Sequence, residues 1–90
     1  MTQHLNLKII GRVQGVFFRL SAKKTADKMG IKGIVRNELD GSVHIEAEGT
    51  QANLKKFLNW CHQGPPLAEV EKIVKTSAKP QGYRSFLVSS

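Results

Sequence analysis

The sequence predicts an α+β domain in which two helices cover one face of an antiparallel sheet. Three observations predict it: runs of alternating apolar and polar residues, two segments with apolar residues at helical spacing, and turn residues between them. The expected order is strand, helix, strand, strand, helix, strand and a short C-terminal strand. This is the split β-α-β (βαββαβ, ferredoxin-like) sandwich. A chain of 90 residues has room for one domain only, so a single domain is expected over residues 1–90.

The first half of the chain is predicted to form a strand, a helix and a β-hairpin. Residues 4–10 alternate, which predicts a strand with one buried face. Apolar residues then recur every three or four positions as far as Gly30, a residue typical of helix ends. Asp40-Gly41 is a strong hairpin signal between a strand over residues 31–37 and the next strand. The residues that carry these patterns are Leu5, Leu7 and Ile9, then Phe18, Ala22, Ala26 and Met29, then Val43, Ile45 and Ala47.

The second half is predicted to form a helix and two further strands. Thr50 is a suitable N-cap, and Gly64-Pro65-Pro66 ends the helix. A fourth strand is expected over residues 68–77 without a definite register, and residues 79–82 form a turn before a closing strand over residues 83–88. The apolar stripe of the helix consists of Leu54, Phe57, Leu58 and Cys61.

Composition limits the classes of function. The net charge of +7, from 14 Lys and Arg against 7 Asp and Glu, favours anionic partners such as nucleic acid, an acidic surface or a phosphorylated small molecule. Charge alone does not choose among them, and many small basic proteins bind nothing by it. No apolar run is long enough for a membrane span or a signal peptide. The single cysteine, Cys61, excludes an internal disulfide, which fits a reducing cytoplasm.

The segment from Gly11 to Arg19 reads Gly-Arg-Val-Gln-Gly-Val-Phe-Phe-Arg and has the composition of an anion-binding loop. Glycine lets backbone N–H groups approach a ligand closely, and N–H groups at a helix start carry the positive end of the helix dipole. Arg19 adds a planar, permanently charged donor that suits a phosphate or a carboxylate. Gly15 alone fits an ordinary turn equally well, but the three residues together favour an anion cradle.

Two motifs resemble those of the acylphosphatase family. The first is similar to G-x-V-Q-G-V-x-F-R and is matched at Gly11, Val13, Gln14, Gly15, Val16, Phe18 and Arg19. The second is similar to G-aromatic-V-basic-N-x-x-x-G-x-V followed by a later glycine, and is matched at Gly33, Val35, Arg36, Asn37, Gly41, Val43 and Gly49. Ile34 departs from the pattern, because the family usually has an aromatic residue there. We expect this change to affect packing or substrate contact.

The resemblance implies hydrolysis of acyl phosphates to a carboxylate and inorganic phosphate. It implies that Arg19 and backbone amides bind the phosphate and that Asn37 positions the attacking water. The amides belong to Gln14, Gly15, Val16, Phe17, Phe18 and Arg19. It also implies a small-molecule substrate and no metal or organic cofactor. We expect a monomer that is inhibited competitively by phosphate and binds no nucleic acid or membrane, although the sequence does not determine the oligomeric state. Glycolytic, carbamoyl and acetyl phosphates all remain open as substrates.

The residues themselves support this chemistry. The matched motif residues include no carboxylate, histidine or thiol that could act as a general base, and the neutral amide of Asn37 can only orient a water. Such a site suits a substrate that is already reactive, because phosphoryl transfer to water from a good leaving group needs mainly charge stabilisation and positioning. Stable phosphate monoesters need a far larger acceleration.

Other residues have simpler interpretations. Phe17 and Phe18 are expected to pack in the core or loop, and Cys61 to pack as a small hydrophobe. The histidines, which have no metal-ligand spacing, are expected at the surface, and three lysines of the first helix are expected on its solvated face. These residues are His4, His44 and His62, and Lys23, Lys24 and Lys28.

Two alternatives remain. A basic RNA-binding module can share the same order of elements, but the predicted first and third strands carry no aromatic residue for base stacking, and Glu46 and Glu48 would repel phosphates. A binding-only or carbamoyl-phosphate-handling relative is the other, because similar domains occur inside larger hydrogenase-maturation enzymes.

Overall fold

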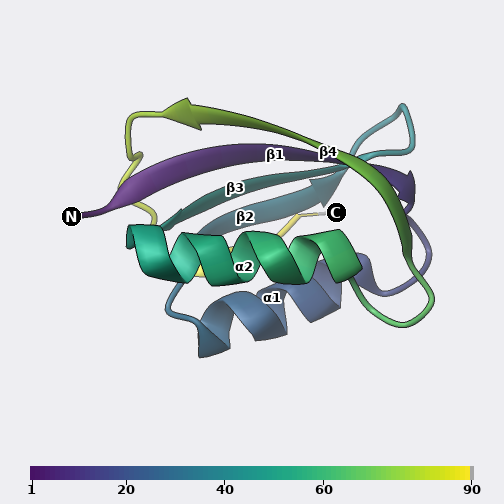
Figure 1. Ribbon diagram of the computed structural model, residues 1–90, viewed down its shortest axis with the longest axis horizontal. Helices are drawn as coiled ribbons and strands as arrows, with labels where there is room; N and C mark the ends of the chain where they lie inside the picture. The colour runs from purple at the N-terminus through teal and green to yellow at the C-terminus, as the bar shows by residue number, and fades with distance from the viewer. Residues whose placement is uncertain (90) are drawn as a thin grey trace.

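A computed structural model describes residues 1–89 and contains the predicted elements in the predicted order. The elements are β1 (Gln3–Arg12), α1 (Phe18–Lys28), β2 (Lys32–Asn37), β3 (Val43–Gly49), α2 (Gln51–Gln63), β4 (Glu69–Ala78) and β5 (Phe86–Val88). Both helices lie on the same face of the sheet (Figure 1). The α+β split arrangement is therefore confirmed. In the described part of the chain, every helix is too short or too polar to cross a membrane.

The sheet has five strands in the order β4-β1-β3-β2-β5. Its first four strands pair antiparallel, whereas β5 pairs parallel with β2, so the sheet is mixed at that edge. The structure also supplies the register of β4, in which Ile73 lies opposite Ile9. The β1–β4 register shifts between Ile10 and Gly11. Gly11 has φ 141°, and a Cβ there would collide with the Glu69 carbonyl, so only glycine fits.

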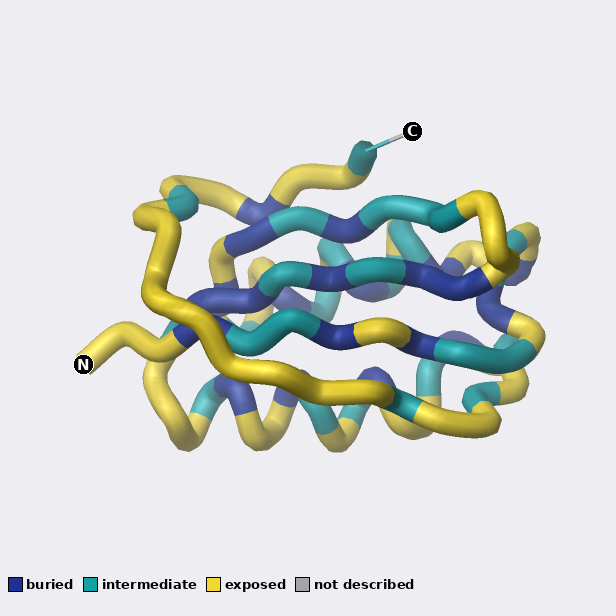
Figure 2. Tube along the Cα trace, turned by 90° about the horizontal axis from the view of Figure 1, so that it is seen from above, coloured by how far each residue is buried: buried dark blue, intermediate teal, exposed yellow. Residues whose placement is uncertain are grey.

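The core lies between the sheet and the two helices. Alternate residues of the central strands are buried, while β4 is exposed along most of its length (Figure 2). The apolar stripes predicted for both helices face this core, and Cys61 is fully buried, which raises the pKa of its thiol. Phe57 packs against Phe86 and Trp60 at centroid distances of 5.9 and 6.1 Å. The aromatic cluster therefore ties α2 to the C-terminal strand.

The face of the sheet away from the helices is not uniformly solvated. His4 and Glu48 are each only 3% exposed, so the prediction that His4 lies at the surface is wrong. Backbone N–H groups of Gln81, Gly82 and Tyr83 all donate to the Glu48 carboxylate. These bonds hold the turn over the sheet, and the closing strand consequently begins at Phe86 rather than at residue 83.

His4 is the centre of this polar cluster. Its Nδ1 lies 2.7 Å from Oε2 of Glu48, and its Nε2 lies 2.7 Å from Oδ1 of Asn6. Burial alone would lower the pKa of His4, but these hydrogen bonds and the charges of Glu48 and Glu46 outweigh it and raise the pKa above 6.5. A protonated ring can donate to both oxygens at once. The cluster therefore favours the imidazolium form and closes the end of the sheet near the N-terminus.

This geometry predicts a pH-dependent stability. Because the folded-state pKa of His4 is raised, its contribution should be complete below the unfolded pKa of about 6.5 and be lost as the pH rises through the folded value. Urea unfolding should show a larger stability difference between wild type and His4→Gln at about pH 6 than at about pH 9. An identical difference at both pH values would mean that His4 is neutral in the native state.

Candidate active site

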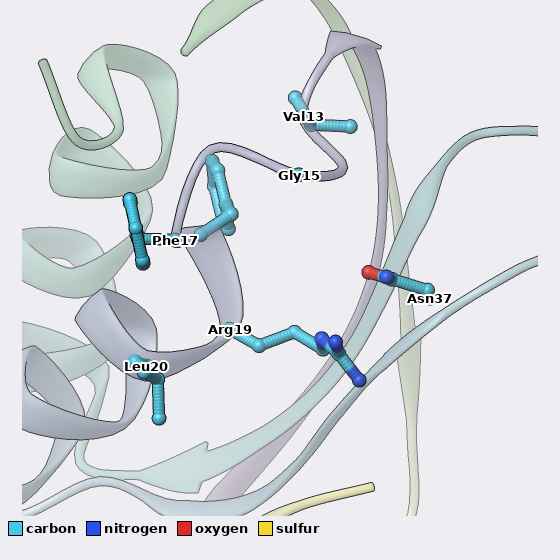
Figure 3. A pocket seen from close by; sticks show the side chains of 7 residues that line it. Val13, Gly15, Phe17, Arg19, Leu20 and Asn37 are labelled. Carbon is cyan, nitrogen blue, oxygen red and sulfur yellow. The ribbon is translucent and has the colours of Figure 1, made fainter. Parts of the chain in front are cut away.

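A cavity of about 250 Å³ opens where the loop after β1, the start of α1 and the end of β2 meet. This volume is at the small end for ligand sites and suits a small molecule. The cavity is lined by Val13, Gly15, Phe17, Phe18, Arg19, Leu20 and Asn37. The two predicted motifs, which are separate in the sequence, therefore share one site (Figure 3).

The loop of residues 13–17 presents the N-terminus of α1 to this cavity. Gly15 has φ 73°, and Phe17 has φ 67°, the one left-handed non-glycine residue in the described chain. No side chain caps the helix, and its first turn contains no acidic residue. The backbone N–H groups of that turn therefore have neither a capping oxygen nor a nearby carboxylate in competition with a bound anion.

Arg19 projects from the first turn of α1 across the cavity toward Asn37 (Figure 3). Its Nη1 donates to the carbonyl oxygen of Ser89 at 2.9 Å, so the C-terminal segment helps to orient the guanidinium. No carboxylate within residues 1–89 forms a salt bridge with Arg19. A neutral carbonyl therefore orients the guanidinium, and no carboxylate of residues 1–89 neutralises its charge. This arrangement suits the binding of an anion.

Asn37 is the last residue of β2, and its alternation with Val35 directs it to the helix side of the sheet.

The hairpin beyond Asn37 closes with a bond from the Glu38 N–H to the Ser42 carbonyl at 2.9 Å. Asp40 accepts from both the backbone and the hydroxyl of Ser42. Lys8 forms an ion pair with Asp40 at 2.8 Å. With the Ser42 bonds, this pair holds the Asp40 pKa well below its usual range. The hairpin that follows Asn37 is therefore held by bonds within itself and by an ion pair to β1.

Gln14 joins the two halves of the site. Its Nε2 donates to the carbonyl oxygens of Glu38 at 2.7 Å and Ser42 at 2.9 Å. One side chain thus connects the loop that leads to Arg19 with the end of β2, where Asn37 lies, and with the start of β3. The sequence predicts only a backbone role for Gln14, because no local pattern shows that residues 14 and 38–42 are neighbours.

The predicted site residues divide into those that line the cavity and those that do not. Gly15, Phe17, Phe18, Arg19 and Asn37 line the cavity, whereas Gln14 and Val16 do not, and Val16 is buried. The packing expected of Phe18 is confirmed, but Phe17 is 68% exposed, so its assignment to packing is wrong. Ile34 does not line the cavity and pairs with Glu46 and Leu87 in the sheet.

Leu20 also lines the cavity and is 57% exposed, and it is not among the residues predicted from the sequence. The one indication in the sequence is that Leu20 is an apolar residue that directly follows Arg19 and lies off the buried face of α1.

Comparisons with known proteins show the family to which the chain belongs. The family model described as acylphosphatase matches residues 5–88. An acylphosphatase of a Nocardioides species is 44% identical over 86 residues, which cover 96% of this chain and 87% of that protein. The crystal structure of acylphosphatase from Bacillus subtilis superposes with a TM-score of 0.94 at 35% identity, with all of both chains covered.

The same fold also occurs within a longer protein. The crystal structure of full-length HypF in its phosphate- and nucleotide-bound form matches with a TM-score of 0.90 and 27% identity, over all of this chain but only 12% of HypF. The curated relative from Nocardioides, by contrast, is covered over most of its own length. The family model, the sequence relatives and the solved structures thus agree over nearly the whole length, and the chain belongs to the acylphosphatase family of hydrolases.

Proposed function

We propose that this chain hydrolyses acyl phosphates through a cradle formed by Arg19 and the backbone amides of residues 14–19, with Asn37 orienting the attacking water. The observation that carries the proposal is that Arg19 and Asn37 line one cavity at the uncapped N-terminus of α1. Amide dipoles and a guanidinium stabilise the charge of a phosphoryl group in the transition state.

The reaction needs no further catalytic group from the protein. The water oxygen, oriented by the Asn37 amide, forms the new bond to phosphorus as the bond to the acyl oxygen breaks. The carboxylate leaves with the bonding electrons and, as a weak base, needs no proton from a general acid. We assign the proton of the water to a phosphoryl oxygen of the substrate. In keeping with this, the described residues that line the cavity include no carboxylate, histidine or thiol.

The proposal extends to how the protein works in the cell. Inorganic phosphate, as a product that carries the same charged group, should compete with the substrate for the cradle. We propose that the chain acts as a single domain and a monomer in the cytoplasm, on a small-molecule substrate and without a metal or an organic cofactor. These points rest on the family membership and on the chemistry of the cavity.

Two substitutions separate the proposed roles. Arg19→Ala should lower kcat/KM for benzoyl phosphate by about a thousandfold or more, because it removes the charged donor of the cradle. Asn37→Ala should lower kcat by about a hundredfold and change the inhibition constant of phosphate by less than about twofold. Steady-state assays with phosphate as inhibitor measure both effects.

Arg12→Ala is the matched control for charge, because Arg12 is exposed and does not line the cavity. An equal loss in this control would attribute the effect to net charge rather than to the cradle. Full turnover in Asn37→Ala would contradict the water-orienting role.

The absence of a titrating base from the mechanism predicts a flat pH profile. The kcat should change little between moderately acidic and neutral pH, because the described residues that line the cavity include no carboxylate, histidine or thiol that could act as a base. A steep transition near pH 6.5 would identify a histidine as a participant. His44→Gln provides the control, since His44 is the partly exposed histidine on β3.

Gln14 should affect turnover more than phosphate affinity. Gln14→Met keeps the length of the side chain but removes both bonds to the hairpin, which should cost about 1–2 kcal/mol of stability. It should lower kcat by a larger factor than it weakens phosphate inhibition, because Asn37 loses its support while the backbone amides remain. Unchanged kcat in a folded Gln14→Met enzyme would show that the local bonds of the hairpin alone position Asn37.

A further inference from the structure

The active-site cavity has an apolar wall that phosphate binding does not explain. Phe17 and Leu20 are large apolar side chains, 68% and 57% exposed, and both line the cavity beside Arg19. Exposed apolar residues are common when scattered over a surface. Here two of them adjoin the proposed phosphate cradle, so their position can affect what is bound with the phosphate.

The backbone conformation of Phe17 is unusual for a residue with a large side chain. The residue occupies the left-handed region with φ 67° and ψ 22°, where glycine is favoured and a bulky residue is uncommon. Its ring is not part of the buried core, unlike that of Phe18, which is 1% exposed. The ring therefore has no packing role in the core that would account for a phenylalanine at this strained position.

The in-line geometry of phosphoryl transfer indicates which part of the substrate would contact this apolar wall. In phosphoryl transfer the attacking and leaving oxygens lie roughly in line on opposite sides of the phosphorus. If Asn37 orients the water, the acyl group must leave on the side of the phosphate away from Asn37. Figure 3 shows Phe17 and Leu20 on that side, across the cavity from Asn37.

We propose that Phe17 and Leu20 form the binding surface for the acyl group and favour substrates whose acyl group is apolar, such as an aromatic or long aliphatic one. This inference rests on the proposed function, because it uses the water position assigned to Asn37. Of the described residues that line the cavity, Arg19 alone is charged, and the cradle assigns it to the phosphate. An acyl group with a second carboxylate or phosphate would therefore find no counter-ion on this wall.

The test compares kcat/KM for benzoyl phosphate and acetyl phosphate in each variant. Leu20→Ala should lower the value for benzoyl phosphate by about three- to tenfold and leave that for acetyl phosphate within about twofold. Comparing variants on the same two substrates cancels the intrinsic reactivity of each. Phe17→Ala keeps the backbone amide and should shift the ratio in the same direction. Leu20→Met, which retains the volume, should keep the wild-type ratio.

Leu39→Ala is the matched control, because Leu39 is fully exposed on the hairpin beyond Asn37 and does not line the cavity. The proposal is overturned if Leu20→Ala and Phe17→Ala leave the benzoyl-to-acetyl ratio unchanged, if they lower both values equally, or if Leu39→Ala shifts the ratio as much. The proposed function fails in a different way: the wild-type protein would hydrolyse neither substrate, or Arg19→Ala would retain the wild-type rate.

Discussion

Antiparallel pairing of β1 with β3 is the constraint on which the site depends. The pairing places Ile9 opposite Val43, so the end of β1 lies beside the start of β3. The loop that follows β1 and the hairpin that precedes β3 must then meet at one end of the sheet. Gln14 uses this proximity by donating to carbonyl oxygens on both sides of the hairpin. The position of Arg19 relative to Asn37 is thus a result of strand register, completed by two hydrogen bonds.

The two ends of the sheet differ in how their charged groups are paired. Near the N-terminus, His4, Glu48 and the backbone of residues 81–83 satisfy one another, and the cluster is buried. At the other end, the carbonyl of Ser89 orients Arg19, and the first turn of α1 carries no capping side chain. At the first end, the hydrogen bonds among these groups hold a turn against the sheet. The second end keeps the charge of Arg19 and the uncapped N-terminus of α1 beside a cavity, an arrangement that suits anion binding.

The cavity also explains why a small set of residue types suffices for the proposed chemistry. A guanidinium and amide dipoles stabilise negative charge, and a side-chain amide orients water without removing a proton. The residues that line the cavity then divide by position: Asn37 lies on one side of Arg19, and the apolar side chains of Phe17 and Leu20 lie on the other. This arrangement fits the proposed in-line reaction, in which water lies on one side of the phosphorus and the acyl group on the other.

The sequence by itself determined the order of elements and the buried stripes of both helices, because periodicity and turn chemistry are local properties. It also contains the two motifs that carry Arg19 and Asn37, which stand out through their resemblance to those of a known family. Only the tertiary structure decided that His4 and Glu48 are buried, that Gln14 bridges the loop and the hairpin, and that Phe17 faces the cavity rather than the core. The physical reason is common to all three. Alternation along a strand distinguishes its two faces, but which distant loop covers a face, or which carbonyl lies within reach of an amide, depends on strand register and on contacts between residues far apart in the chain.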